Sequence, residues 1–260
     1  MEFKQIQTDI CSLDLPELDR YTRSDIKENG GVSHILKANN HNITINAKNK
    51  VNGLDLLDCI KENSVKTVFF DPQYRGVLDK LSYGNEGKKR GKARSGLPQM
   101  TNEIILAFIS KIENILVSSG YLFLWVDKFH LVEGVSSWVV NASKLFPVDM
   151  ITWNKERIGM GYRTRRQSEY LVVIQKEPKR AKSTWSIHNI PDVWSEKVNK
   201  EHPHSKPIGL QSKLIEATTV EGDVVCDPAS GGYSVFECCK RLNRTFIGCD
   251  LVFGEDKQCG

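Results

Sequence analysis

The sequence has little of what marks membrane or secreted proteins. Its apolar runs, such as residues 121–126 and 170–174, stop far short of the roughly 18 residues that a membrane-spanning helix needs. The N-terminal segment is charged and lacks the apolar core of a secretory signal. These absences predict a cytoplasmic protein that contacts no membrane.

The cysteines do not form a pattern that suits a disulfide framework or a zinc knuckle. Seven cysteines are an odd number, and no two are spaced as C-x-x-C. His188, His202 and His204 lie near one another in the sequence but have no matching cysteine or acidic cluster. We therefore expect reduced, buried thiols and no metal site.

The composition is that of an ordinary folded protein. The 260 residues are 40% hydrophobic and 26% charged, which suits one large domain and excludes a disordered chain. The net charge of +4 is modest, but residues 75–100 hold seven basic residues against two acidic ones. The positive charge of the protein is therefore concentrated in one segment.

Strand and helix patterns alternate from about residue 54 onward. Buried strands are predicted at residues 65–70, 121–126, 149–153, 170–174, 223–226 and 245–249. Helices are predicted at 54–60, from 102 to about 120, at 130–146, from 207 to the turn at 221–222, and up to 242. This order predicts an α/β fold, with a doubly wound, mostly parallel sheet and helices on both faces.

The pattern also suggests how the chain is divided. Residues 1–50 show weak periodicity, apart from a short strand at 43–45, and are predicted to be an N-terminal extension. Residues 51–260 form the predicted main domain. Within it, the polar, Lys-rich residues 177–200 contain Trp185 and Trp194 and are predicted to form a short excursion.

Three predicted strands run directly into acidic residues, namely Asp71, Asp227 and Asp250. In open α/β sheets, ligands bind at the carboxyl ends of the strands. Asp250 follows Asp227 by about twenty residues, where it can accept hydrogen bonds from two ribose hydroxyls. The turn after Asp227 is rich in small residues that let a ligand approach the backbone: Pro228, Ala229, Ser230, Gly231 and Gly232. This pattern predicts a nucleoside-containing cofactor, either a nicotinamide dinucleotide or S-adenosylmethionine.

Residues 71–74 indicate chemistry on the exocyclic amine of a planar base. The Asp71 carboxylate and a backbone carbonyl freed from sheet pairing by Pro72 can accept the two amine hydrogens. Tyr74 can stack on the ring, and Gln73 completes the tetrapeptide. Such hydrogen bonds localise the nitrogen lone pair, so a weak nucleophile becomes usable.

With these residues in view, the sequence resembles the amino-group DNA methyltransferases, in the permuted group whose catalytic motif precedes the cofactor motif. Four segments carry the resemblance, in order: residues 64–75, Lys206-Pro207 with the helix that follows, residues 224–232 and residues 243–250. Their conjunction is far more specific than any one motif. The resemblance covers roughly residues 51–251 and implies a Rossmann-like methyltransferase fold.

The resemblance implies a site-specific enzyme that moves a methyl group from S-adenosylmethionine to adenine N6 in double-stranded DNA. The base would be flipped out of the duplex into the pocket at residues 71–74. In this family the corresponding tetrapeptide begins with Asp for adenine or, more often, with Ser for cytosine N4, so Asp71 favours adenine. The implied cofactor-binding residues are Lys206 and Pro207 at the methionine end, residues 227–232, and Asp250.

Two basic segments are candidates for holding DNA. The first lies directly after the catalytic tetrapeptide and consists of Lys88, Lys89, Arg90, Lys92 and Arg94. The second is the loop 157–166, where Arg163, Arg165 and Arg166 suit phosphates or guanine edges. In the family, the loop that corresponds to residues 157–166 lies near the target strand.

The sequence departs from the family pattern at two places. Gln73 replaces the usual second proline, while Ala229 and Tyr233 replace the aromatic residue and the second glycine of the cofactor motif. Four alternatives stay open: a cytosine-N4 enzyme, an RNA substrate, a DNA-binding or regulatory partner with a degenerate cofactor pocket, and a nicotinamide-dependent oxidoreductase. The last of these leaves residues 71–74 and both basic segments without a role. No pattern encodes the recognition sequence, the oligomeric state or an accompanying restriction enzyme.

Overall fold

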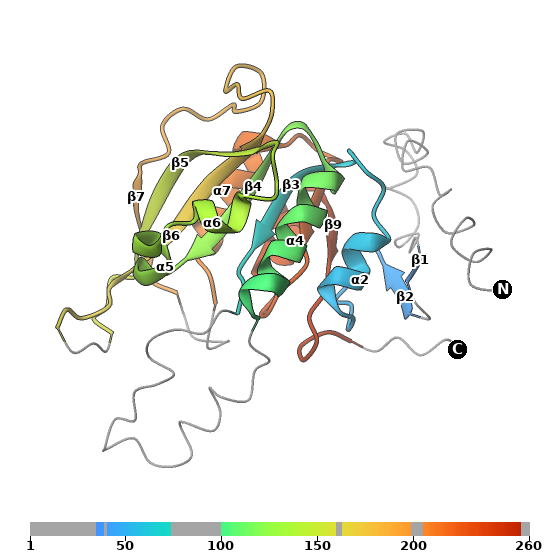
Figure 1. Ribbon diagram of the computed structural model, residues 1–260, viewed down its shortest axis with the longest axis horizontal. Helices are drawn as coiled ribbons and strands as arrows, with labels where there is room; N and C mark the ends of the chain where they lie inside the picture. Colours follow the sequence, from blue (N-terminus) through green and yellow to red (C-terminus); the bar gives the residue numbers. More distant parts are fainter. Residues whose placement is uncertain (1–34, 39–40, 74–99, 160–162, 199–204, 256–260) are drawn as a thin grey trace, which may run out of the picture.

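A large mixed sheet forms the centre of the molecule. The computed structural model describes residues 35–38, 41–73, 100–159, 163–198 and 205–255 (Figure 1). Within them, the large sheet has seven strands in the order β7-β5-β6-β4-β3-β8-β9, and β1 (Ile35–Ala38) pairs with β2 (His41–Thr44) separately. The strands of the large sheet are β3 (Val65–Phe70), β4 (Leu116–Val126), β5 (Leu145–Asn154), β6 (Ser168–Lys176), β7 (Val193–Ser195), β8 (Val224–Asp227) and β9 (Thr245–Gly248).

Strand direction is parallel through most of the sheet. β3 is parallel to β4 and to β8, β8 is parallel to β9, and β5 is parallel to β7. β6 runs antiparallel to both of its neighbours, β4 and β5, and the described residues between β5 and β6 form no helix. The predicted mostly parallel sheet is confirmed. The reversal of β6 brings its first residues to the same edge as the carboxyl ends of the other strands.

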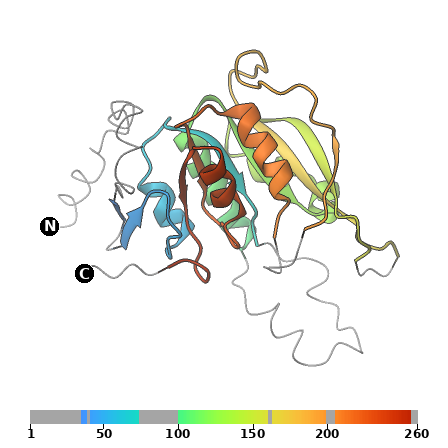
Figure 2. The same cartoon turned by 180° about the vertical axis from the view of Figure 1, so that it is seen from behind.

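Helices cover both faces of the sheet. One face, turned toward the viewer in Figure 1, carries α2 (Gly53–Asp58), α4 (Asn102–Ile115) and α6 (Ser136–Val139). The opposite face, which is in front in Figure 2, carries α7 (Ile208–Thr218) and α8 (Ser234–Arg241). The predicted double winding is therefore confirmed.

The hydrophobic core has two parts, one on each face of the sheet. Successive side chains of a strand point to opposite faces, so Phe70 packs in the part that contains the α4 side chains and Phe69 packs in the part that contains the α7 side chains. Both rings are almost fully buried. The strand that carries Asp71 at its end is thus held on both sides.

The predicted helix at 130–146 is wrong. The chain forms α5 (Lys128–Glu133) and then the short α6, and β5 begins at Leu145. Gly134 has a φ of 102° at the end of α5, a backbone conformation that glycine adopts without a steric penalty and that terminates the helix. Helix α4 also ends earlier than predicted, because β4 begins at Leu116.

Residues just before position 51 pack with the main domain. Ile43 and Ile45 are buried in the core on the α4 side. The Asn49 side chain donates hydrogen bonds from Nδ2 to the carbonyls of Thr44 and Gly248, both at 2.9 Å, and accepts one from the Thr44 N–H at 2.7 Å. The division at residue 50 stays a prediction, but packing is continuous across it.

The described part of the predicted excursion, residues 177–198, returns to the sheet. Trp185 and Trp194 pack against the core on the α7 side, and residues 193–195 form the edge strand β7. The Glu196 carboxylate accepts hydrogen bonds from the N–H groups of Gly209 at 3.0 Å and Leu210 at 3.1 Å. This segment therefore caps the first turn of α7, which follows Lys206 and Pro207 in the chain.

Candidate active site

A cavity of about 290 Å³ opens at the carboxyl ends of β3, β8 and β9. The side chains of Asp71, Asp227 and Asp250 all line it, as the strand-end pattern predicted. Lys206 and the turn from Pro228 to Gly232 line the same cavity. The sheet order places β8 between β3 and β9, so three segments far apart in the sequence meet at one edge.

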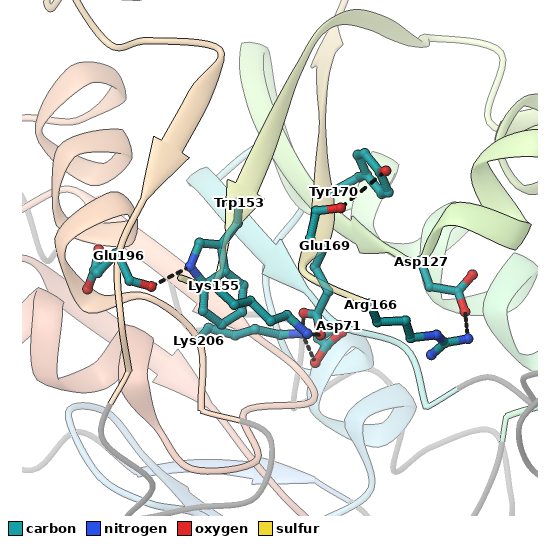
Figure 3. Close-up of polar contacts among 10 residues, drawn as sticks. Asp71, Asp127, Trp153, Lys155, Arg166, Glu169, Tyr170, Glu196 and Lys206 are labelled. Atoms are coloured by element: carbon teal, nitrogen blue, oxygen red, sulfur yellow. Dashed lines mark hydrogen bonds and ion pairs between the residues drawn. The ribbon is translucent and has the colours of Figure 1, made fainter. Parts of the chain in front are cut away.

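Asp71 forms an ion pair at the end of β3. The Lys206 ammonium Nζ lies 2.9 Å from Asp71 Oδ2 and 3.0 Å from Glu169 Oε2 (Figure 3). It also lies 4.8 Å from the centroid of the Trp125 ring, which the buried end of β4 supplies. Burial by itself lowers the pKa of Lys206, but the charges of Asp71 and Glu169 raise that pKa above its ordinary value. Lys206 is therefore an ammonium ion at neutral pH.

Glu169 and Lys155 belong to the same cluster, although no sequence pattern singled them out. Glu169 stands near the start of β6, and Lys155 directly follows β5 and ion-pairs with Glu169 (Figure 3). Burial raises the pKa of Glu169, but Lys206 and Lys155 together lower it to about 2. The missing signal was the antiparallel pairing of β5 with β6, which brings the start of one strand beside the end of the other.

Asp227 lies in a different environment. Its side chain is buried and accepts a hydrogen bond from the Ala229 N–H at 3.2 Å. Burial and the nearby charges of Asp71 and Asp250 raise the pKa of Asp227 to about 8. The negative charges that raise this pKa also make this part of the cavity favourable for a cation.

The turn after Asp227 has an unusual backbone. Gly231 has a φ of 50°, and Tyr233, at the N-cap of α8, is in the left-handed region with a φ of 58°. A residue with a Cβ in that region costs roughly 1–2 kcal/mol. The Tyr233 ring is buried, and its hydroxyl donates a 2.8 Å hydrogen bond to the Asn49 carbonyl. Tyr233 thus adopts a backbone conformation that favours glycine, and it ties the turn to the N-terminal segment.

Asp250 organises the turn that follows β9. Its Oδ1 accepts hydrogen bonds from the N–H groups of Val252 and Phe253, both at 2.8 Å, and its Oδ2 accepts one from the Gly231 N–H at 3.1 Å. The carboxylate therefore links the two turns that border the cavity. A carboxylate oxygen has two acceptor positions, so Oδ2 keeps one for a ligand hydroxyl.

The arginines of the loop 157–166, or arginine loop, differ in their contacts: one packs against the protein and another is exposed. Arg166 packs its guanidinium 5.4 Å from the centroid of the Phe129 ring, and its NH2 lies 3.6 Å from Asp127 Oδ2 (Figure 3). Arg165 donates from Nε to the Gly159 carbonyl at 2.6 Å, while Arg163 is exposed. Gln73 lines the cavity, and Pro72 and Pro207 are buried. Six candidates lie outside the described residues: Tyr74, Lys88, Lys89, Arg90, Lys92 and Arg94.

The described residues hold no candidate for two other kinds of site. Among them, no group of three His, Cys, Asp or Glu side chains is arranged to hold a metal ion. No helix in the described ranges is long and apolar enough to cross a membrane. Of the described cysteines, all free thiols, Cys226, Cys238, Cys239 and Cys249 are buried and Cys59 is partly buried.

Comparison with known proteins decides the family. The model of a family described as DNA methylase, the N6/N4 methyltransferases, matches residues 65–252. The chain belongs to this family. A relative in Haemophilus parahaemolyticus, the Type II methyltransferase M.HhaII, is 68% identical over 215 residues, which cover 82% of this chain and 94% of the relative. The Type II methyltransferase M2.MboI of Moraxella bovis is 24% identical over 223 residues, or 76% of this chain and 80% of that protein.

Solved structures share the fold. A complex of M1.HpyAVI with S-adenosylmethionine superposes with a TM-score of 0.56 at 16% identity, covering 78% of this chain and 92% of that one. The PvuII DNA methyltransferase, which is cytosine-N4-specific, gives a TM-score of 0.56 at 15% identity, covering 80% and 86%. The Rossmann-like methyltransferase fold is thereby confirmed.

Membership in the family confirms the enzyme class and its cofactor. The N6/N4 family consists of S-adenosylmethionine-dependent DNA methyltransferases. The nicotinamide-dependent alternative is therefore wrong, since its only support was the motif from Asp227 to Asp250. That motif serves either nucleoside cofactor equally well.

Proposed function

We propose that this protein methylates adenine N6 in double-stranded DNA at a site of the Type II restriction-modification kind. The observation that carries the proposal is the position of Asp71. It follows the end of β3 and lines the same cavity as Asp227 and Asp250. One cavity thus joins a carboxylate that suits an exocyclic amine to a turn that suits a nucleoside cofactor. Asp at the head of the tetrapeptide favours adenine over cytosine.

The cavity fits S-adenosylmethionine on the chemistry of its lining. Gln211 lines the cavity from the first turn of α7 and is 1% exposed, yet its Oε1 has no hydrogen-bond partner among the described residues. A buried acceptor without a donor costs about 1–3 kcal/mol, and an ammonium group on a ligand would supply the donor. Asp250 would take the ribose hydroxyls, and the turn from Pro228 to Gly232 with Lys206 and Pro207 would border the methionine end.

The bound cofactor supplies a methyl group that its sulfonium makes electrophilic. The protein then has to orient the amine, accept hydrogen bonds from its N–H groups and exclude water. Asp71 accepts one N–H of the target amine and so localises the nitrogen lone pair. Phe69, Phe70 and Trp125 make the walls beside Asp71 apolar, which strengthens that hydrogen bond.

DNA would approach the same edge of the sheet. Tyr74 would stack on the flipped base. Arg163 and Arg165, together with the basic segment from Lys88 to Arg94, would contact the backbone phosphates. Arg166, which Asp127 already holds, would keep the loop in position beside the strand.

The test is to identify the methylated nucleoside. Duplex DNA is incubated with the protein and S-adenosylmethionine that carries a labelled methyl group, digested to nucleosides, and analysed for the label. We expect label on N6-methyladenine with the wild type and with Asp149→Ala, a matched control on an exposed carboxylate, and no label with Asp71→Ala.

Each other result has a defined meaning. Label on N4-methylcytosine overturns the base assignment and keeps the pocket. Label on RNA alone, with none on DNA, overturns the proposal that double-stranded DNA is the substrate. Absence of label with every nucleic acid, together with no stabilisation of the fold by S-adenosylmethionine, favours the regulatory partner.

A further inference from the structure

A chain of alternating charges runs from the catalytic tetrapeptide to the β5–β6 connection. Lys206 bridges Asp71 and Glu169, and the other oxygen of Glu169 pairs with Lys155 (Figure 3). The Lys206 and Glu169 side chains are 13% and 28% exposed, and Trp125 covers one side of the ammonium. Two carboxylates and two ammonium groups thus share one partly buried cluster.

This arrangement creates a competition at Asp71. In the proposed function Asp71 accepts a hydrogen bond from the target amine, but the bond from Lys206 to its Oδ2 holds the carboxylate in the orientation that suits the ammonium. An ammonium is a stronger donor than a neutral amine, because charge-assisted hydrogen bonds are about twice as strong. If Asp71 were its only partner, Lys206 could leave only by becoming an unpaired buried charge, which is strongly unfavourable.

Glu169 removes this obstacle. Its Oε2 lies 3.0 Å from Lys206 Nζ, so the ammonium keeps a charged partner when it loses Asp71. Lys155 pairs with the other Glu169 oxygen and keeps the Glu169 carboxylate charged. The face of the Trp125 ring offers the cation a further favourable contact.

We propose that Glu169 is a positioning residue for methyl transfer, which retains the Lys206 ammonium while the Asp71 carboxylate turns to the target amine. The proposal rests on the proposed function of Asp71. It involves no proton transfer, because Lys206 stays an ammonium and Glu169 a carboxylate throughout. Glu169 itself touches neither the base nor the cofactor.

The direct test is Glu169→Gln, compared with Glu156→Gln. Glu156 is an exposed carboxylate in the same β5–β6 connection and serves as the matched control. Removing the Glu169 charge leaves Lys206 bound to Asp71 alone. We expect kcat to fall on the order of 10²-fold, as for a misplaced catalytic group, with unchanged S-adenosylmethionine affinity. The melting transition should stay cooperative but shift to lower temperature, because Lys155 loses its carboxylate partner. Glu156→Gln should match the wild type.

A double-mutant cycle separates positioning from general support. Because Glu169 acts through Lys206, adding Glu169→Gln to Lys206→Met should change kcat by less than about threefold. Glu169→Asp, which keeps the negative charge, should recover part of the activity that Glu169→Gln loses. Losses from Glu169→Gln and Lys206→Met that multiply independently would overturn the proposal.

Other outcomes are equally decisive. A wild-type kcat in Glu169→Gln overturns the proposal, as does a loss of cofactor binding or of the melting transition in both Glu169→Gln and Glu169→Asp. Asp71→Ala is measured in the same assay to separate the two claims. If Asp71→Ala keeps its activity, the proposed function fails. If Asp71→Ala is inactive and Glu169→Gln is normal, the role of Glu169 alone fails.

Discussion

The carboxylates in the two halves of the cavity have different kinds of partner. In the half at the end of β3, Asp71 pairs with Lys206, which also pairs with Glu169, a residue outside the cavity lining. In the half at the ends of β8 and β9, Asp227 and Asp250 accept hydrogen bonds from backbone N–H groups, and in the described part of the chain neither forms an ion pair. In the first half the carboxylate charge is neutralised by a lysine, whereas in the second half no described lysine or arginine pairs with the acids.

The difference suits two different ligands. An adenine base is neutral, so a balanced half can take it up without leaving a buried charge unpaired. S-adenosylmethionine carries a sulfonium and an ammonium, and it brings positive charge to the half where Asp227 has a raised pKa. We infer that the amine binds in the half at β3 and the cofactor in the half at β8 and β9.

The largest expected effect comes from Asp71→Ala. Removing the acceptor of the amine hydrogen should lower kcat by at least about 10²-fold, the usual contribution of a positioned acid–base group. Steady-state methylation of duplex DNA measures the loss, with Asp149→Ala as control. Asp71→Ala activity within tenfold of the wild type would contradict the account.

A pH series on Asp227→Asn probes the other half. The pKa of an aspartate in the unfolded chain is about 4, and that of Asp227 in the folded protein is about 8. Between these pH values the folded protein holds a proton that the unfolded chain has lost, so rising pH destabilises the folded state by at most about 1.4 kcal/mol per pH unit. Above pH 8 this effect levels off.

Asp227→Asn removes the titrating group, so the cofactor-free variant should gain stability relative to the wild type from pH 5 to pH 8. Thermal unfolding at each pH measures the difference. Parallel melting curves across that window would show that Asp227 is ionised in the folded protein. The cavity would then contain no carboxyl group of raised pKa.

Gln211→Leu should separate stability from cofactor binding. It removes a buried acceptor that has no partner in the described part of the chain, so the free protein should gain about 1 kcal/mol of stability, while its affinity for S-adenosylmethionine falls. Gln175→Leu is the matched control, because Gln175 is also buried but donates to the carbonyls of Ser119 and Arg180. That variant should lose stability. Chemical denaturation and calorimetric titration give both quantities, and unchanged cofactor affinity in Gln211→Leu would remove Gln211 from the site.

The smallest effects belong to the arginine loop. Arg163→Ala should weaken DNA binding severalfold and reduce the slope of log affinity against log salt by about 1. Arg166→Ala should instead lower the melting temperature, because Arg166 packs on Phe129 and pairs with Asp127. Salt-dependent binding and thermal unfolding of both variants test this, and the reverse assignment of effects would contradict it.

The sequence predicts the acidic residues of the cavity better than the charged cluster beside it. Asp71, Asp227 and Asp250 each end a buried strand, and a parallel sheet brings such ends together, so local patterns suffice. Glu169 and Lys155 meet only because β6 runs antiparallel beside β5, and no local pattern announces that pairing. The same holds for Asn49, whose amide bridges Thr44 and Gly248, a contact between distant parts of the chain.

Helix positions follow the same rule. The apolar spacing from Ile105 to Ile112 predicts α4, and the Thr101 side chain caps the helix by accepting a hydrogen bond from the Ile104 N–H. The stretch after His130 has similar apolar residues, but Gly134 in a left-handed conformation interrupts it. Apolar spacing predicts a helix correctly where the backbone conformation also allows one. It fails where a single glycine with a positive φ ends the helix.

Calorimetric titration of S-adenosylmethionine into Asp71→Ala and Asp250→Ala tests the division of the cavity most directly. We predict that Asp71→Ala binds the cofactor within about threefold of the wild type while its methyl transfer is abolished. We predict that Asp250→Ala loses at least about tenfold in affinity, as expected when a partly buried, hydrogen-bonded carboxylate is removed. Loss of cofactor binding in Asp71→Ala, with wild-type binding in Asp250→Ala, would contradict it.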